Sequence, residues 1–300
     1  MNISGHNHRI EYTTNVFINA DADTAEVRDW KEKLISIAEQ IPAQADTLKP
    51  LIQFLVASIS PAKIYMLQHK DTATTAIGGF IDLLIVISGK NNVPFTEMEP
   101  VLEMVYLKDQ RVACSLHSEG NVIEGLRNGH IFYSLNCIPE NLVYDDKVAM
   151  YPSTTPEAMQ ELKQRLREQF MLNFKKAIDF NESATYLHEN NPSHIIGFLL
   201  HQAVELTYRS VLQSLNGYDK KTHEIRSLKK HIRRCAPQLN SIFPDDTDEE
   251  KRLLDILENA YLKARYDSQY NIPECDLSKL FDKVMRLQET AKKIVEEKTS

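Results

Sequence analysis

The 300-residue sequence contains few cysteines, few glycines and no long apolar run. Its four cysteines form no CxxC pair, so we expect single thiols in a reducing compartment rather than a disulfide framework. Only nine glycines are present, which favours helices over tight turns. No apolar run approaches the roughly 18 residues needed to cross a bilayer. The opening MNISGHNHRIEYTT lacks a signal-peptide core, and we expect a cytoplasmic protein with no membrane partner.

Positive charge is not in excess either. The chain has 35 Lys and Arg against 42 Asp and Glu, a net charge of −7. Residues 1–150 contain 12 basic and 19 acidic side chains, and residues 151–300 contain 23 of each, so the first half carries the whole excess. An acidic first half argues against nonspecific duplex binding there, because phosphate contacts require cations.

The first half mixes helix patterns with short strand patterns. We expect a flexible N-terminus at residues 1–22, followed by an α+β domain at residues 23–150. Apolar runs rich in β-branched residues predict strands, and helical periodicity predicts the segments between them. The expected strands are 62–68, 80–88, 111–117 and the short 131–135, and the expected helices are 24–40, 45–59, 96–106 and 121–127. Prolines and an Asp-Asp pair predict a linker at 136–155.

The second half, residues 155–300, has only helical patterns. Helix starts and stops at Pro, Thr and Asn-Gly positions separate five segments with short connections, which is typical of an antiparallel bundle. The expected helices are 157–189, 192–215, 223–235, 247–266 and 276–298. The fold class expected for the whole chain is therefore α+β, with a mixed sheet followed by an all-α bundle.

Three short blocks in this half carry a family resemblance. They are Phe-Leu-Leu-His-Gln-Ala-Val-Glu at 198–205, Thr-His-Glu-Ile at 222–225, and Leu-Glu-Asn-Ala-Tyr-Leu-Lys-Ala-Arg-Tyr at 257–266. Their order and spacing resemble the HEPN family, a helical domain. The polar positions that carry the resemblance are His201, Gln202, Glu205 and His223. The resemblance implies pairing of two copies through the helical domain.

Many HEPN domains are ribonucleases, and their motif is an arginine, four to six residues, and a histidine. RNA cleavage through the 2′-hydroxyl requires an acid or base with a pKa near neutrality and a cation for the phosphate. Arg265 matches the arginine, but the histidine position falls at 270–272, where Tyr270 is the one titratable side chain. Tyrosine, with an ordinary pKa of about 10, is a poor substitute at neutral pH. Arg265 and Tyr270 are thus candidates for a catalytic pair that departs from the family pattern.

A basic run forms a second candidate site on the expected third helix. It allows two interpretations, a patch that contacts RNA phosphates or a solvated helix face partly neutralised by the acidic loop 245–250. A literal Arg-x4-His spacing, Arg226 to His231, lies in this run, outside the position where the family has its motif. The residues of the candidate patch are Arg226, Lys229, Lys230, Arg233 and Arg234.

The expected strand 80–88 resembles part of the small nucleotidyltransferase fold, which is often joined to HEPN domains. Members hold two Mg²⁺ ions with Asp-x-Asp at the start of one strand and a third carboxylate on a later strand. Asp82 matches the second Asp, whereas Phe80 occupies the first position and 111–117 has no carboxylate. The resemblance implies a degenerate domain, with Asp82 as its one nucleotide- or metal-like residue. We expect no metal site and no cofactor, Mg²⁺ included.

These observations favour a HEPN-like protein that binds nucleotide or RNA with little or no catalysis, in a stress, defence or toxin–antitoxin-like setting. That setting is implied by the resemblance alone. Two alternatives stay open: an active HEPN ribonuclease that uses Arg265, and a dimeric scaffold with no nucleic-acid ligand.

Overall fold

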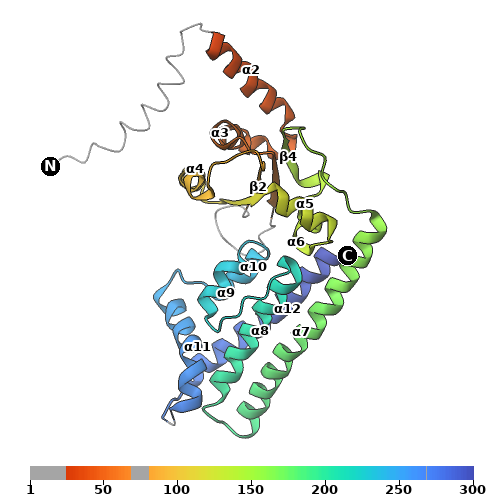
Figure 1. Cartoon of the computed structure of the whole chain (residues 1–300). Helices are drawn as coiled ribbons and strands as arrows, with labels where there is room; N and C mark the ends of the chain where they lie inside the picture. Colours follow the sequence, from red (N-terminus) through yellow and green to blue (C-terminus); the bar gives the residue numbers. More distant parts are fainter. Residues whose placement is uncertain (1–24, 69–80, 268) are drawn as a thin grey trace, which may run out of the picture.

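The computed structural model describes residues 25–68, 81–267 and 269–300 (Figure 1). The expected flexible N-terminus at 1–22 and Phe80, the first residue of the expected strand 80–88, lie outside these residues. A sheet with helices α2 to α6 forms one end of the molecule, and helices α7 to α12 form the other. The mixed α+β fold class is confirmed.

The sheet has four strands in the order β3-β2-β1-β4. Strand β1 (Lys63–Gln68) pairs antiparallel with β2 (Ile81–Ile87) and with β4 (Leu142–Asp145), whereas β2 pairs parallel with β3 (Val112–Ser118). The central strand β2 is apolar apart from Asp82, and the residues after Ile81 are all buried. Such a run is expected of a strand covered on both faces.

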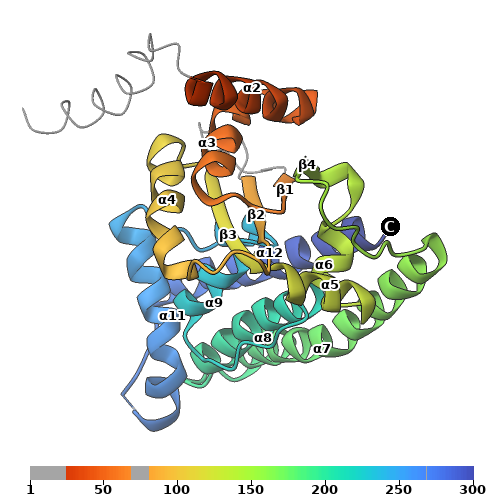
Figure 2. The same cartoon turned by 45° about the horizontal axis from the view of Figure 1, so that its top comes forward.

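Alternation along the strands divides the first half into two cores. Leu83 and Ile85 face the layer made by α3 (Lys49–Ile59) and α4 (Phe95–Lys108). Leu84 and Val86 face α5 (Glu119–Arg127) on the other side. Helix α2 (Ala25–Gln40) lies across the outer end of this unit, next to α3 (Figure 2).

Two expectations in this half are wrong. Residues 131–135, expected as a strand, belong to helix α6 (Ile131–Asn136), because Ile131 and Leu135 are four residues apart and pack together on the core of the helical half. The expected linker at 136–155 contains the short helix η2 (Pro139–Asn141) and strand β4. The residues Leu-Val-Tyr of β4 form the edge strand of the sheet. This strand was not predicted because it is only four residues long.

In the second half, helices are the only regular structure among the described residues. Helix α8 (Ile196–Asn216) is its centre and packs against α7 (Pro156–Asn190), α11 (Asp248–Tyr266) and α12 (Glu274–Thr299). Helix α9 (Ile225–Ile232) packs on α8, and the single turn α10 (Pro237–Asn240) packs on α9 and α12. The Thr155 and Thr247 hydroxyls cap α7 and α11 by accepting hydrogen bonds from Ala158 and Glu250. Among the described helices, none is long and apolar enough to cross a membrane.

Two glycines on α8 have different structural reasons. Gly217 ends the helix in the left-handed region, with φ of +67°, as glycine at this position commonly does. Gly197, in the first turn, lies where a Cβ atom would come within 2.8 Å of Ile272 and 3.1 Å of Ala260. Its missing side chain therefore allows α11 and the segment after it to pack closely on α8.

Candidate functional site

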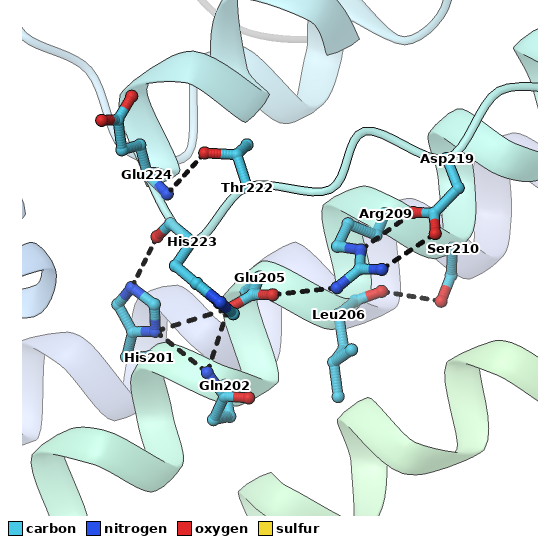
Figure 3. A network of polar contacts seen from close by, with 10 residues as sticks. All are labelled: His201, Gln202, Glu205, Leu206, Arg209, Ser210, Asp219, Thr222, His223 and Glu224. Carbon is cyan, nitrogen blue, oxygen red and sulfur yellow. Dashed lines mark hydrogen bonds and ion pairs between the residues drawn. The ribbon is translucent and has the colours of Figure 1, made fainter. Parts of the chain in front are cut away.

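The polar residues of the helical half meet at a buried carboxylate on α8 (Figure 3). Glu205 is 1% exposed, and its Oε2 accepts hydrogen bonds from His223 Nδ1 at 2.9 Å and Gln202 Nε2 at 3.0 Å. Its Oε1 accepts one from Arg209 Nη1 at 3.1 Å. A buried carboxylate requires such partners. Three donors from two segments of chain thus converge on Glu205.

Arg209 extends this network to the loop between α8 and α9. Its Nε and Nη2 each donate to one carboxylate oxygen of Asp219 at 2.9 Å, a two-point contact. The hydrogen bonds from Arg209 hold the pKa of the Asp219 carboxyl below its ordinary value. Because Arg209 also binds Glu205, the loop is fastened to α8 at both Asp219 and His223.

His201 contributes to the network through the backbone of that loop. Its Nε2 lies 3.0 Å from the carbonyl oxygen of His223, so Nε2 carries the proton and donates it, and Nδ1 is left to accept from Gln202 at 3.4 Å. The side chain is fully buried, and burial lowers the pKa of His201 to about 4. His201 is therefore neutral at physiological pH and acts as a structural support for His223.

His223 itself lies at the surface. Its side chain is 53% exposed, and its ring stacks on Tyr261 of α11 with centroids 4.3 Å apart and planes 18° from parallel. The Nδ1–H donates to Glu205, which leaves Nε2 with no hydrogen-bond partner among the described residues. The structure thus presents an oriented imidazole beside an aromatic ring.

Arg265 lies against the same ring. Its guanidinium carbon is 4.2 Å from the Tyr261 centroid, 5.0 Å from that of Phe198 and 5.1 Å from that of Tyr266. The Nε donates to the Tyr261 carbonyl oxygen at 2.6 Å. Arg265 forms no ion pair with any residue that the structure describes. Arg209, Arg226 and Arg252 each pair with one or two carboxylates.

The Tyr270 side chain does not form a site together with Arg265. The Tyr270 hydroxyl donates to the carbonyl oxygen of Ile256 at 3.0 Å, and burial raises the pKa of Tyr270 to about 12. Its ring packs near Gly197 at the start of α8. A phenol held in this way does not act as a base near neutral pH, and Tyr270 is a packing residue in this structure.

The basic run on α9 does not form one open surface. Arg226 is paired with Asp255 and Glu258 of α11, and Lys229 is 4% exposed with its pKa lowered by burial. Lys230, Arg233 and Arg234 are exposed. One face of the helix is buried in the bundle. The basic run therefore has one buried side chain (Lys229), one paired with α11 (Arg226) and three exposed ones (Lys230, Arg233 and Arg234).

Asp82 lies in the interior between the two halves. It is 1% exposed, its two carboxylate oxygens have no hydrogen-bond partner among the described residues, and burial raises its pKa to about 6, opposed by the charge of Arg234. Its neighbour on β3 is Ala113, and the described residues contain no group of three His, Cys, Asp or Glu side chains that could hold a metal ion. One carboxylate does not fit a two-Mg²⁺ site.

The sequence indicated part of this arrangement. The sequence resemblance includes His201, Gln202, Glu205 and His223, and the structure joins these four residues in one network. Phe198 and Tyr261 lie in the blocks that carry the resemblance, but the sequence does not predict their contact with Arg265 or the role of Arg209. Two signals are present: Arg209 follows Glu205 by four residues, and Arg265 follows Tyr261 by four, a spacing that places side chains together on a helix.

Residues 171–299 match the family model of the HEPN domain, which supports the resemblance found in the sequence for this part of the chain. No curated protein matches the chain significantly. The family match covers helices α7 to α12 apart from the first half of α7, and therefore includes the network around Glu205 and the rings around Arg265. It does not extend to the nucleotidyltransferase resemblance of the first half.

Proposed function

We propose that this HEPN domain binds single-stranded RNA at the surface formed by Phe198, His223, Tyr261, Arg265 and Tyr266, here called the Arg265 surface. The observation that carries the proposal is the state of Arg265. Its guanidinium is positioned by three aromatic rings and one backbone carbonyl, yet it has no carboxylate partner among the described residues.

The chemistry of this surface suits an unpaired RNA strand. A guanidinium recognises phosphate oxygens through parallel N–H donors, and aromatic side chains stack on unpaired bases with little sequence preference. Tyr266 is 78% exposed and extends the stacking surface beyond Arg265. Duplex RNA, whose bases are already stacked, is expected to bind less tightly.

HEPN domains commonly dimerise and bind RNA, and we extend both properties to this chain. A homodimer formed through the helical domain would place two Arg265 surfaces in one assembly. We propose the same stress, defence or toxin–antitoxin-like setting that the family suggests. The competing possibility is a dimeric scaffold with no nucleic-acid ligand.

Binding can be tested with a fluorescently labelled single-stranded RNA of about 12 nucleotides. We expect Arg265→Ala to weaken binding about tenfold, because a hydrogen bond to a charged group contributes roughly 1.5–3 kcal/mol. The matched control is Lys263→Ala, which removes one exposed charge from the same turn of α11. Equal losses in both variants would show nonspecific attraction only. No binding by the wild type would favour the scaffold.

A second candidate function, RNA cleavage, is favoured by the position of His223. Its Nδ1–H is held by the buried Glu205, an arrangement that orients an imidazole as a general base. Nε2 would take the proton of a 2′-hydroxyl, the 2′-oxygen would bond to phosphorus, and the P–O5′ bond would break. The leaving 5′-oxygen would take a proton from solvent. Arg265 would stabilise the charge on the phosphate oxygens.

Cleavage has its own test. Wild-type protein in EDTA should produce 2′,3′-cyclic phosphate ends from single-stranded RNA, and His223→Gln should abolish them while RNA affinity falls less than in Arg265→Ala. A strand with one 2′-deoxy position should resist cleavage at that position only. RNA that stays intact under these conditions would exclude this candidate and leave binding as the function.

A further inference from the structure

A pocket in the first half of the chain has the properties of a small-molecule site. Its volume is 390 Å³, and it lies between the β1–β4 edge of the sheet, helix α6 and the segment that leads into α7. This size falls within the range of about 300–1,000 Å³ typical of ligand pockets. The pocket excludes Asp82 and contains no residue of the Arg265 surface.

We propose that this pocket binds an uncharged heteroaromatic ligand of the nucleoside class. The site goes beyond the proposed RNA binding, since it lies on the sheet unit, outside the matched HEPN residues. Three features of the pocket point to such a ligand: unused hydroxyl groups in the interior, compensated charge, and aromatic walls.

Two hydroxyl groups in the pocket are available to a ligand. Ser134 of α6 is 1% exposed, and its Oγ has no hydrogen-bond partner among the described residues. A buried hydroxyl left in this state costs free energy that a ligand can recover. Tyr65 of β1 is 4% exposed, and its hydroxyl forms no hydrogen bond with a described residue. Burial, followed by the nearby Cys137 and Asp145, raises the pKa of Tyr65, so its hydroxyl remains a donor.

The charges inside the pocket compensate one another. Lys63, 5% exposed, places its Nζ 2.6 Å from an oxygen of Asp145, and both residues line the pocket. A ligand that enters this depth meets no net charge, and burying a second, unpaired charge there would be unfavourable. Lys147 lies at the exposed rim, where a phosphate on the ligand could remain in solvent.

The walls suit a flat ring. Tyr151, on the segment that leads into α7, has its ring 4.6 Å from the Lys63 ammonium and donates its hydroxyl to Glu119 at 3.2 Å. Two tyrosine rings, Tyr65 and Tyr151, and apolar side chains such as Leu126 line the same space. Aromatic walls favour a planar ligand, and the unused hydroxyls favour ring nitrogens, ring carbonyls or ribose hydroxyls.

The test is isothermal titration of the full-length protein with adenosine, guanosine, cytidine and uridine. We expect saturable binding of at least one of them with one ligand per chain. Ser134→Ala should weaken that binding about fivefold, the effect of one hydrogen bond, and Tyr65→Phe should act similarly. Ser134→Leu, which fills the pocket, should abolish it. The matched control is Ser214→Ala, because Ser214 is equally buried and also lacks a hydroxyl partner among the described residues, but lies on α8.

Several results would overturn the assignment. One is no heat from any of the four nucleosides, and another is affinity unchanged by Ser134→Leu in a variant that circular dichroism shows to be folded. The monophosphate of the bound nucleoside should bind within about threefold of the nucleoside itself. Monophosphate binding about ten times tighter would identify a phosphate site instead. Arg265→Ala should leave nucleoside affinity unchanged, so the two proposed sites fail or succeed independently.

Discussion

The guanidinium carbon of Arg265 lies 4.2 Å from the centroid of the Tyr261 ring, and the His223 ring stacks on the same tyrosine. The stacking of His223 on Tyr261 joins the loop that precedes α9 to helix α11. It places Arg265 beside the imidazole of His223. Both this arrangement and the buried groups around it have measurable consequences.

Glu205 is expected to determine the stability of the helical half. Glu205→Ala removes the buried acceptor of three hydrogen bonds, from Gln202, Arg209 and His223, and should lower the free energy of unfolding by about 2 kcal/mol. Urea unfolding monitored by circular dichroism should show this loss. Glu249→Ala, which breaks the exposed contact with Lys279, is the control and should leave the midpoint unchanged. Equal effects would contradict the assigned role of Glu205.

Tyr270 is expected to matter for stability and not for RNA. Tyr270→Phe removes the hydrogen bond to Ile256 and should lower the free energy of unfolding by about 1 kcal/mol. At every pH from about 6 to 9, the variant should bind RNA as tightly as wild type, and cleave it at the same rate if the wild type cleaves. The reason is that a group with a pKa of about 12 does not titrate in this range. A loss of RNA affinity comparable to that of Arg265→Ala would show that Tyr270 takes part in RNA binding.

The buried Asp82 should make stability depend on pH. Its pKa is raised from the ordinary 3.8 to about 6, so between these values the folded state keeps a proton that the unfolded state has lost. Stability contributed by this group is therefore present at low pH and lost as the pH rises through about 6. Asp82→Asn removes this penalty.

At about pH 8 the Asp82→Asn variant is expected to gain about 3 kcal/mol over wild type, since each pKa unit corresponds to about 1.4 kcal/mol. At about pH 4 the two proteins should unfold with similar free energies. Denaturant titrations at both pH values compare the same pair of proteins, so the titration of all other groups cancels. A variant that is less stable than wild type at the higher pH would show that the Asp82 carboxylate is stabilised in the folded protein.

Lys229 should contribute nothing to RNA binding despite its place in the basic run. Its side chain is drawn into the interior, and burial lowers its pKa, so Lys229→Met should keep RNA affinity within about twofold of wild type. Lys230→Met, one position along and exposed, is the matched comparison for loss of charge. If Lys229→Met weakened binding more than Lys230→Met, helix α9 would be the RNA surface.

The helical half could be predicted from the sequence because its determinants are local. Thr155, Thr247 and Gly217 mark helix ends by their own backbone preferences, and the blocks around Glu205 and Arg265 lie within single helices. The contact of His223 with Tyr261 could not be predicted, because it depends on how the start of α9 docks on α11.

In the first half, the errors arose where tertiary contacts overrode local preference. Residues 131–135 have a β-like composition but form α6, since Ile131 and Leu135 pack on the helical core. Strand β4 has only four residues and is defined by its pairing with β1. The burial of Asp82 near the charge of Arg234, which belongs to the second half, could not be predicted from the pattern of a single strand.

The central claim, that Arg265 contacts RNA phosphate, is tested most directly by the salt dependence of single-stranded RNA binding. The slope of log affinity against log salt concentration reports the number of phosphates neutralised, about 0.7 for each on a single strand. We predict that Arg265→Ala reduces the slope by about 0.7 for each Arg265 surface that the strand contacts, whereas Tyr261→Leu weakens binding through lost stacking. An unchanged slope in Arg265→Ala would contradict the account.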